Sequence, residues 1–471
     1  MIRASTNVTC PNLDRLLNEQ SAERILGEDL GIAWGDAQPK EIRIERAWRR
    51  REGGFAIEWS FGLGRARFSV SVATSAELDR WGEENGADGH RTPKLEPWGL
   101  GGLHVWMPDR SACVFTPDRD PQLAQLGDCL SSTRMGQYLD IRTPEADGQA
   151  QRSDVYCHLM GYRAGRRAAI AYTVDGGNPS ERRLLGKAFY DDRAERLLSL
   201  HERVGAALAE GSNRRVRVPR PVKVLRDFQM VLFAWEDGRR KPRGFSAQTE
   251  FFAAGAAALG VLHNVNLPGL PRFGMSEELC IADHWREALE TAFPFDAEAV
   301  GEIADRLHVC AAQVELGPDV TLHRDFYEKQ FLVRGGTVTL LDLDTLASGP
   351  AEVDLGNLLA HATLLALQHE AGIDEFSRLC RSCIEGYEDG GGRARGKALA
   401  LFTATALLRI GGVHRFRTAS RRFTGALWRV AAELAGLGQR RGAGCVGHDA
   451  TGVHGVGMGQ VMAGVFGERF Q

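Results

Sequence analysis

Short runs of alternating apolar and polar residues dominate the first quarter of the chain. Between about Glu41 and Thr116, the segments EIRIERAW, FAIEWSF, RARFSVSVA, LHVWM and ACVFT follow this pattern, separated by glycine, proline or aspartate. A period of two is that of a β-strand with one buried face. The pattern predicts an antiparallel sheet, a helix in PQLAQLGDCLSS, and then a polar, breaker-rich boundary at 142–152.

A second β-rich unit follows this boundary. Strand patterns occupy DVYCHLMGYRAGRRAAIAYTV, RRLLGKAFY and VPRPVKVLRDFQMVLFAW, while DDRAERLLSLHERVGAALAEG between them has helical spacing, begins with acids and stops at glycine. From about Ala247 to Leu437 the spacing becomes helical, interrupted by a charged loop and by the strands QFLVR and TVTLLDLD. The tail after Gly438 is glycine-rich, and we expect it to pack poorly.

This order of elements predicts an α+β fold of the bilobal protein-kinase-like type, with an additional N-terminal antiparallel-sheet domain. We expect four parts, which are an N-terminal α+β domain of open role (1–150), a β-rich small lobe with a hinge (151–240), a helical large lobe with the catalytic and metal-binding loops (241–437), and a glycine-rich tail (438–471). The N-terminal domain would serve as a lid, a dimer surface or a substrate-recruiting domain.

Composition narrows the classes of partner. The 471 residues carry a formal net charge of −3, so no whole-molecule field favours nucleic acid or an anionic membrane. Nine cysteines, an odd number spread over a long chain, indicate reduced thiols. The start lacks a signal-peptide pattern, and apolar runs such as Leu358 to Leu367 are shorter than the roughly 18 residues of a membrane span. We expect a cytoplasmic protein without nucleic-acid or membrane partners, and a homodimer is possible.

The charged loop TLHRDFYEKQF, residues 321–331, carries the candidate chemistry. It contains His323, Asp325 and Gln330 in the pattern H-x-D-x-x-x-x-Q, and Asp342 lies at the end of the following strand, TVTLL. Phosphoryl transfer needs held phosphates, placed Mg²⁺ and an aligned acceptor hydroxyl, with little covalent work by the protein. A carboxylate that leaves a buried strand suits a hard cation. The combination predicts phosphoryl transfer, whereas His-Arg-Asp in isolation would equally suit a solvated turn.

The motifs also resemble those of a known family. HRDFYEKQFLV paired with LLDLDTLASGPAEVDLGNLL is similar to the catalytic and metal-binding motifs of the aminoglycoside phosphotransferase-like kinases, which share a catalytic core with eukaryotic-type protein kinases. LGVLHNVNLPGLPRFG resembles their leucine-histidine-to-proline helix end, and RVPRPVKVLRDFQMVLFAWEDG their strand-to-hinge passage. The resemblance covers about residues 153–430 and leaves residues 1–150 outside.

The resemblance implies roles for the residues that match. Asp325 takes the position of the catalytic base, and His323 that of a structural residue that holds the loop. Gln330 takes the metal-binding carboxamide position, which is usually asparagine. Asp342 is implied as the principal Mg²⁺ ligand, and Asp354 as a brace of the loop from the next helix.

The small lobe supplies candidate cofactor-binding residues. Lys187 in LLGKAFY ends an apolar strand where the family's phosphate-binding lysine belongs, and Glu202 lies fifteen residues later as its partner, with Glu195 as the second choice. Trp235, at the end of the strand that leads into the hinge, completes the set.

The phosphate-covering turn is expected in GYRAGRRAAIAY. This segment offers Gly161 and Gly165 but not G-x-G-x-x-G. Arg166 and Arg167 either supply charge in place of backbone amides or are surface residues.

Three functions fit these motifs. The first is an O-phosphotransferase that uses ATP or GTP with Mg²⁺ and acts on a small-molecule hydroxyl, such as that of an amino-sugar, a sugar, an amino alcohol or an antibiotic. Only eleven residues separate Asp342 from Asp354, which leaves no room for a long regulated loop and favours this function. The second is a kinase that acts on a protein or peptide. The third is a catalytically inactive nucleotide-binding scaffold.

Acidic residues of the C-terminal region suit a cationic acceptor or solvent equally. They are Asp344, Glu352, Glu370, Asp374 and Glu375.

The remaining metal-like patterns have simpler explanations. Cys380-x-x-Cys383 has no partner pair and lies on a helical stretch, so we expect two core thiols. Cys445, His448 and His454 lie in the tail without regular spacing, which makes a metal site there a weak hypothesis.

Overall fold

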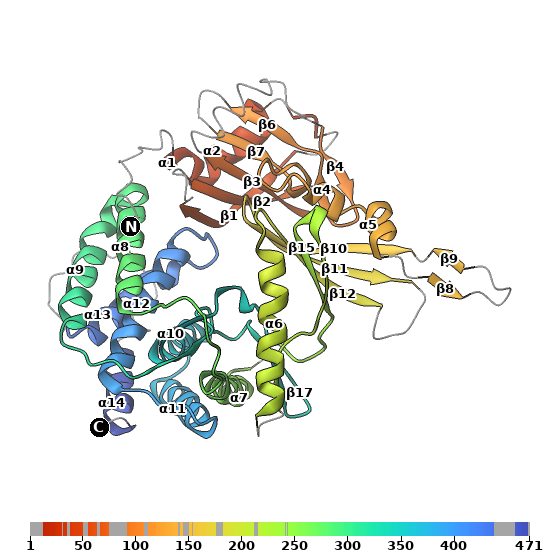
Figure 1. Ribbon diagram of the computed structural model, residues 1–471. Coiled ribbons are helices and arrows are strands. Elements are labelled where there is room, and N and C mark those ends of the chain that lie inside the picture. The colour runs from red at the N-terminus through yellow and green to blue at the C-terminus, as the bar shows by residue number, and fades with distance from the viewer. Residues whose placement is uncertain are drawn as a thin grey trace. The chain divides into compact units, whose positions relative to one another are not determined.

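A computed structural model describes most of the chain. The described residues are 13–30, 32–34, 38–49, 55–63, 66–74, 92–107, 112–139, 142–144, 150–152, 154–175, 182–211, 215–240, 242, 244–437 and 457–469. Within the chain, contacts define two compact units (Figure 1). The sheet unit comprises Met1–Ser199, Arg220–Trp235 and Phe416–Ala419, and the helical unit comprises Leu200–Pro219, Glu236–Arg415 and Ser420–Gln471.

The first sheet of the sheet unit is the antiparallel sheet predicted from the two-residue periodicity. Its strand order is β1-β2-β3-β7-β6, with bounds Lys40–Arg49, Phe55–Leu63, Ala66–Thr74, Ala112–Phe115 and His104–Met107. Three short helices, α1 (Leu13–Leu16), α2 (Glu19–Arg24) and η1 (Ile25–Asp29), precede it. Trp59, which is fully buried, donates its indole N–H to the carbonyl of Leu16 at 3.0 Å and so joins the sheet to α1.

The second sheet is also antiparallel, in the order β10-β11-β12-β15-β14. Its strands are Val155–Arg163, Arg167–Val174, Arg183–Phe189, Met230–Ala234 and Pro221–Leu225. Two small hairpins, β4–β5 (Lys94–Glu96, Gly99–Gly101) and β8–β9 (Arg142–Pro144, Ala150–Arg152), complete the described strands of this unit.

Alternate residues of β12 define the two faces of the second sheet. Leu185 and Phe189 pack with the start of α6 (Arg193–Glu210), while Leu184 and Ala188 pack with α4 (Leu126–Cys129) and α5 (Ser132–Leu139). One core therefore joins residues from both sides of the domain boundary predicted at residue 150.

The helical unit contains the large helices of the second half of the chain. They are α7 (Phe245–His263), α8 (Met275–Ala292), α9 (Pro294–Ala311), α10 (Glu352–Gln368), α11 (Ile373–Asp389), α12 (Gly396–Arg415), α13 (Thr424–Leu434) and α14 (Met458–Arg469), drawn in green to blue in Figure 1. Fifteen residues of α10 are buried, which makes it a central helix of this unit. The predicted α+β class, with antiparallel sheets followed by a helical part, is confirmed.

Short strands carry the loops between α9 and α10. β16 (Asp319–Leu322) pairs with β19 (Ala347–Pro350), and the β17–β18 hairpin (Phe331–Arg334, Thr337–Leu340) pairs in parallel with β13 (Val216–Arg217). The 3-10 turn η5 (Leu343–Thr345) connects β18 to β19.

Two features of the helical unit differ from the sequence analysis. The tail was expected to pack poorly, but α14 is a helix whose Met458, Met462, Val465 and Phe466 are buried. Among the described residues, α12 is long and apolar enough to cross a membrane by length and composition alone. However, 78% of its apolar window is buried inside the protein, as in a core helix.

Candidate active site

The loop between β16 and β17 brings three predicted site residues together. Gln330 donates from Nε2 to the carboxylates of Asp325, at 3.4 Å, and Asp342, at 3.5 Å. Both distances are long for hydrogen bonds, so these contacts are weak and the amide can turn. The convergence itself is the geometry that the sequence predicted.

Hairpin register explains why these residues meet. Phe331 pairs with Leu340 in the β17–β18 hairpin, and the N–H of Leu341 donates to the carbonyl of Gln330 at 2.8 Å. Residues 330 and 341 are therefore neighbours across the hairpin, and Asp342 follows immediately. His323 donates from Nε2 to the carbonyl of Leu341 at 2.7 Å and is fully buried, in agreement with its predicted structural role.

Two residues of the site have a left-handed backbone. φ is +70° at Arg324, next to Asp325, and +57° at Asp342. Such values are uncommon for residues other than glycine, cost free energy and persist only where the surroundings hold them. Asp342 is one of the residues to which the sequence assigned chemistry, and Arg324 directly precedes another, Asp325.

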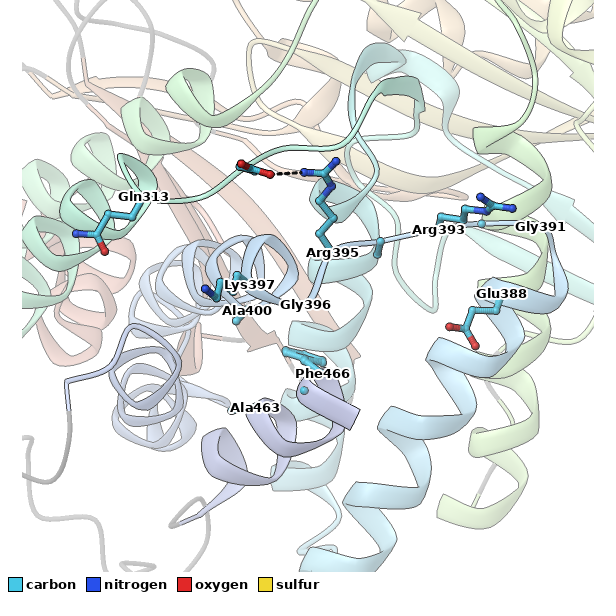
Figure 2. A pocket seen from close by; sticks show the side chains of 14 residues that line it. Gln313, Glu388, Gly391, Arg393, Arg395, Gly396, Lys397, Ala400, Ala463 and Phe466 are labelled. Atoms are coloured by element: carbon cyan, nitrogen blue, oxygen red, sulfur yellow. Dashed lines mark hydrogen bonds and ion pairs between the residues drawn. The ribbon is translucent and has the colours of Figure 1, made fainter. Parts of the chain in front are cut away.

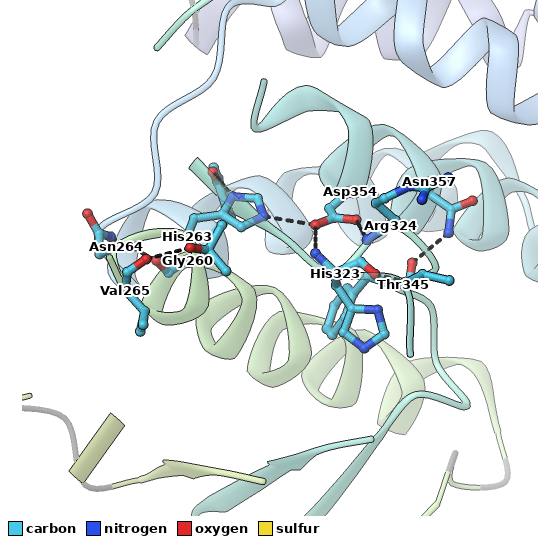
Figure 3. A network of polar contacts seen from close by, with 12 residues as sticks. Gly260, His263, Asn264, Val265, His323, Arg324, Thr345, Asp354 and Asn357 are labelled. Carbon is cyan, nitrogen blue, oxygen red and sulfur yellow. Dashed lines mark hydrogen bonds and ion pairs between the residues drawn. The ribbon is translucent and has the colours of Figure 1, made fainter. Parts of the chain in front are cut away.

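Asp354 supplies the restraint on the first of these residues. Its carboxylate accepts the backbone N–H groups of His323 and Arg324, each at 2.6 Å (Figure 3). Asp354 is fully buried, and charge-assisted hydrogen bonds of this kind are the stronger ones. The bracing role expected for Asp354 is thus present in the structure.

A buried chain continues from Asp354 to two other helices. His263, at the end of α7, lies 3.1 Å from Asp354 through Nε2 and 2.7 Å from the hydroxyl of Tyr387 on α11 through Nδ1. A carboxylate only accepts, so Nε2 of His263 donates to Asp354. Burial, reinforced by the carboxylates of Glu352 and Asp354, raises the pKa of Tyr387, which keeps its hydroxyl protonated.

The donor set at the convergence fits a hard cation. Asp325 and Asp342 provide carboxylate oxygens, and Gln330 provides a carboxamide oxygen once its amide turns over, which is the oxygen chemistry that Mg²⁺ prefers. Asp342 and Gln330 would hold the ion, and Asp325 would remain for the acceptor.

Part of the chain matches a known protein family. The model of the phosphotransferase enzyme family, APH, matches residues 177–396. The predicted resemblance to this family is confirmed over those residues. We call residues 177–396 the family segment. In the comparison with curated proteins, nothing matches the chain.

Solved structures add three similar proteins. A choline/ethanolamine kinase family protein from Mesorhizobium loti has 14% identity and a TM-score of 0.42, covering 66% of this chain and 92% of that one. Choline kinase from Cryptosporidium parvum Iowa II has 11% identity and a TM-score of 0.48, covering 65% and 96%. Spectinomycin phosphotransferase APH(9)-Ia, in complex with ADP and spectinomycin, has 12% identity and a TM-score of 0.41, covering 72% and 95%.

The small-lobe candidates of the family segment belong mostly to the sheet unit. Lys187 lies half-buried on β12, on the same face as Leu185 and Phe189 because side chains alternate along a strand. The indole of Trp235 packs against the guanidinium of Arg183, 4.0 Å from the ring centre. The grouping of Lys187 and Trp235 with the helical-unit carboxylates stays a prediction.

The two acidic candidates on α6 are both exposed. Glu195 accepts a hydrogen bond from Arg226 Nε at 2.5 Å, so this second-choice partner is already engaged. Glu202 remains the predicted partner of Lys187.

The predicted phosphate-covering turn is hydrogen-bonded to Asp120 within the sheet unit. Gly165 donates its backbone N–H to Asp120 at 2.7 Å, and the hydroxyl of Tyr162 donates to the same carboxylate oxygen at 2.7 Å. Ala164 packs into the core of the first sheet, beside Trp106. The Gly165 amide is therefore not available to a phosphate, and this turn lies before the family segment begins.

The acids proposed for an acceptor pocket separate into structural and exposed groups. Glu352 is 1% exposed and accepts the N–H of Arg395 at 2.7 Å. Glu375 accepts the N–H of Gly372 at 3.1 Å and caps α11. Asp344 is half-buried, and Glu370, Asp374 and Glu375 are exposed.

A separate cavity of about 1300 Å³ lies in the helical unit (Figure 2). The start of α12 and the end of α14 line it, with Arg393, Lys397 and Phe466 among its walls. Its walls contain none of the predicted site residues.

The cysteine predictions have two outcomes. Cys380 and Cys383 are free and fully buried, as expected of core thiols, and burial raises the pKa of both. Cys445, His448 and His454 lie outside the described residues. Within the described part of the chain, no group of three or more His, Cys, Asp or Glu side chains could hold a metal ion.

Sequence reasoning missed the polar residues behind the loop. Asn357 donates from Nδ2 to the carbonyl of Phe326 at 2.9 Å, and Arg409 Nη2 donates to Asn357 Oδ1 at 2.6 Å. Asn357 follows Asp354 by three residues on one helix, and this spacing places both on the same face. The three-residue spacing of Asp354 and Asn357 is the sequence signal that could have identified Asn357 as a residue behind the loop.

Proposed function

We propose that this chain is a phosphotransferase that moves the γ-phosphoryl group of Mg-ATP, or Mg-GTP, to the hydroxyl of a small molecule. The convergence of Asp325, Gln330 and Asp342 in one strained, braced loop carries the proposal. The family model over residues 177–396 supports phosphoryl transfer as the reaction class.

Each loop residue has a role in this reaction. The acceptor oxygen attacks Pγ and forms the new O–P bond, while the bond from Pγ to the β,γ-bridging oxygen breaks and the nucleoside diphosphate leaves. Asp325 accepts the proton of the acceptor hydroxyl as that oxygen attacks, an effect typically worth about 10² to 10⁴ in rate. Asp342 and Gln330 would hold Mg²⁺, which would supply neutralisation of the phosphate charge.

The roles of the nucleotide-binding residues are proposed from the family resemblance. We assign Lys187 to the phosphates, Glu202 to the orientation of that lysine, and Trp235 to the wall of the nucleotide site. We place the enzyme in the cytoplasm, acting without nucleic acid or membrane, and a homodimer remains open.

The short passage from Asp342 to Asp354 favours a small acceptor over a peptide. η5 and β19 occupy most of it, and β19 is paired with β16. Arg324 points its guanidinium at the ring of Phe273, 3.7 Å from its centre, so it does not extend toward a regulated segment. These two observations support the small-molecule reading.

Nucleotide binding and turnover test the proposal together. With Mg²⁺, ATP at about 100 times its Kd should stabilise the protein by about 2.7 kcal/mol in a thermal-shift assay. ADP release across a panel of sugars, amino alcohols and aminoglycosides, compared with peptides, should identify a small acceptor. Asp325→Asn should lower turnover by about 10² or more while nucleotide binding persists.

Asp389→Asn, which changes an exposed carboxylate at the end of α11 that is assigned to no site, is the matched control and should behave like wild type. Absence of Mg²⁺-dependent stabilisation would favour the scaffold function instead. Turnover retained in Asp325→Asn would remove the base assignment.

A further inference from the structure

The loop of the helical unit is tied on both sides of Asp325. On the preceding side, Arg324 stacks its guanidinium on Phe273. On the following side, the carbonyl of Phe326 accepts a hydrogen bond from Asn357. The residue that carries the candidate base thus lies between two anchored neighbours.

Arg409, on α12, controls the second tie. It donates to Asn357 Oδ1 at 2.6 Å, and Asn357 is 2% exposed. An amide group has one accepting and one donating end, so an arginine at Oδ1 leaves Nδ2 to face Phe326. Without that donor, the amide could rotate and present an oxygen to the carbonyl of Phe326, which would release the loop.

We propose that Arg409 is a positioning residue that holds Asp325 for phosphoryl transfer, through Asn357 and the carbonyl of Phe326. The inference rests on the proposed function and deepens it.

Arg409→Gln tests the proposal, with Arg415→Gln as the matched control. Arg415 is also half-buried on α12, but it pairs with Asp296 and stacks on Phe293 at 4.0 Å. We expect Arg409→Gln to lower kcat for ADP release by about 10- to 100-fold, because small misplacements of reacting groups cost that much, with the nucleotide KM within about threefold. Amide hydrogen exchange in segment 321–332 should become faster, and Arg415→Gln should change neither quantity.

Two results would overturn the proposal. One is wild-type kcat and exchange in Arg409→Gln. The other is an equal loss in Arg415→Gln, which would show that general stability alone had changed. If Arg409→Gln fails to fold, Arg409→Lys keeps the positive charge at this position but not the planar guanidinium that bonds Asn357. It should retain part of kcat while exchange in 321–332 rises, and unchanged exchange would count against the proposal.

The exchange measurement separates this inference from the proposed function. If the wild-type protein releases no ADP, the proposed function fails. Exchange in segment 321–332 still decides whether Arg409 positions the loop.

Discussion

At the residue scale, two buried carboxylates near the start of α10 differ in how they are satisfied. Asp354 accepts two backbone N–H groups and contacts His263. Glu352 accepts the N–H of Arg395 at one oxygen, and its second oxygen has no hydrogen-bond partner among the described residues. Burial is the largest cause that raises the pKa of Glu352 above its ordinary value of 4.5.

This pKa predicts a pH dependence of stability. Between pH 4.5 and the raised pKa, the folded chain binds more of the Glu352 proton than the unfolded chain does, so the unfolding free energy falls as pH rises. Glu352→Gln keeps an oxygen for Arg395 and removes the titration. The unfolding free energy of the variant relative to that of wild type should therefore increase between pH 4.5 and pH 8. The increase should be about 1.4 kcal/mol for each pH unit by which the folded-state pKa of Glu352 exceeds 4.5.

Melting temperatures at pH 5 and pH 8 measure this difference. Glu315→Gln, which removes the exposed carboxylate paired with Arg395 at 3.2 Å, is the control and should keep the wild-type pH dependence. An identical pH dependence in Glu352→Gln and wild type would contradict the assignment.

At the element scale, the β10–β11 turn is an anchor between the two sheets of the sheet unit. Asp120 is 2% exposed and follows the first sheet directly in the chain. It accepts hydrogen bonds from Tyr162 and Gly165, and burial, followed by the charge of Asp120, raises the pKa of Tyr162 so that its hydroxyl stays a donor. Part of the N-terminal region therefore belongs structurally to the second sheet.

Substitution of Asp120 should loosen this anchor. Asp120→Ala leaves the buried Tyr162 hydroxyl and Gly165 N–H without their acceptor, which costs about 1–3 kcal/mol for each unsatisfied group. We expect a lower melting temperature and faster hydrogen exchange in segment 162–168. Tyr162→Phe removes one hydrogen bond and should cost about 1 kcal/mol.

Asp154→Asn changes an exposed carboxylate one residue before β10 and serves as the control. Unchanged exchange in segment 162–168 of Asp120→Ala would show that the turn is held by packing of Ala164 rather than by the carboxylate.

At the scale of the whole molecule, sequence patterns predicted the features that depend on residues close together in the chain. The loop motif and the β17–β18 hairpin are close in sequence, and the resemblance of both motifs to one family implied that Asp325, Gln330 and Asp342 act together. Two-residue periodicity likewise predicted both sheets. These features depend on neighbours along the chain.

Contacts between distant segments could not be predicted in this way. The tie from Asp120 to Gly165 and the tie from Arg409 to Asn357 each join polar residues whose partners have no periodic signal. In α14, the buried Met458, Met462 and Val465 do have helical spacing, but the surrounding glycines concealed it.

The most direct test of the account is the Mg²⁺ dependence of ATP binding in Asp342→Asn. The wild-type protein should bind ATP at least tenfold more tightly with Mg²⁺ than without it in calorimetric titrations. In Asp342→Asn this Mg²⁺ enhancement should disappear, whereas Asp325→Asn should keep it within about threefold, because Asp342 is the one of these two carboxylates that is assigned to the ion. Full Mg²⁺ enhancement in Asp342→Asn would contradict the claim that the carboxylates at 325 and 342 divide acceptor and metal between them.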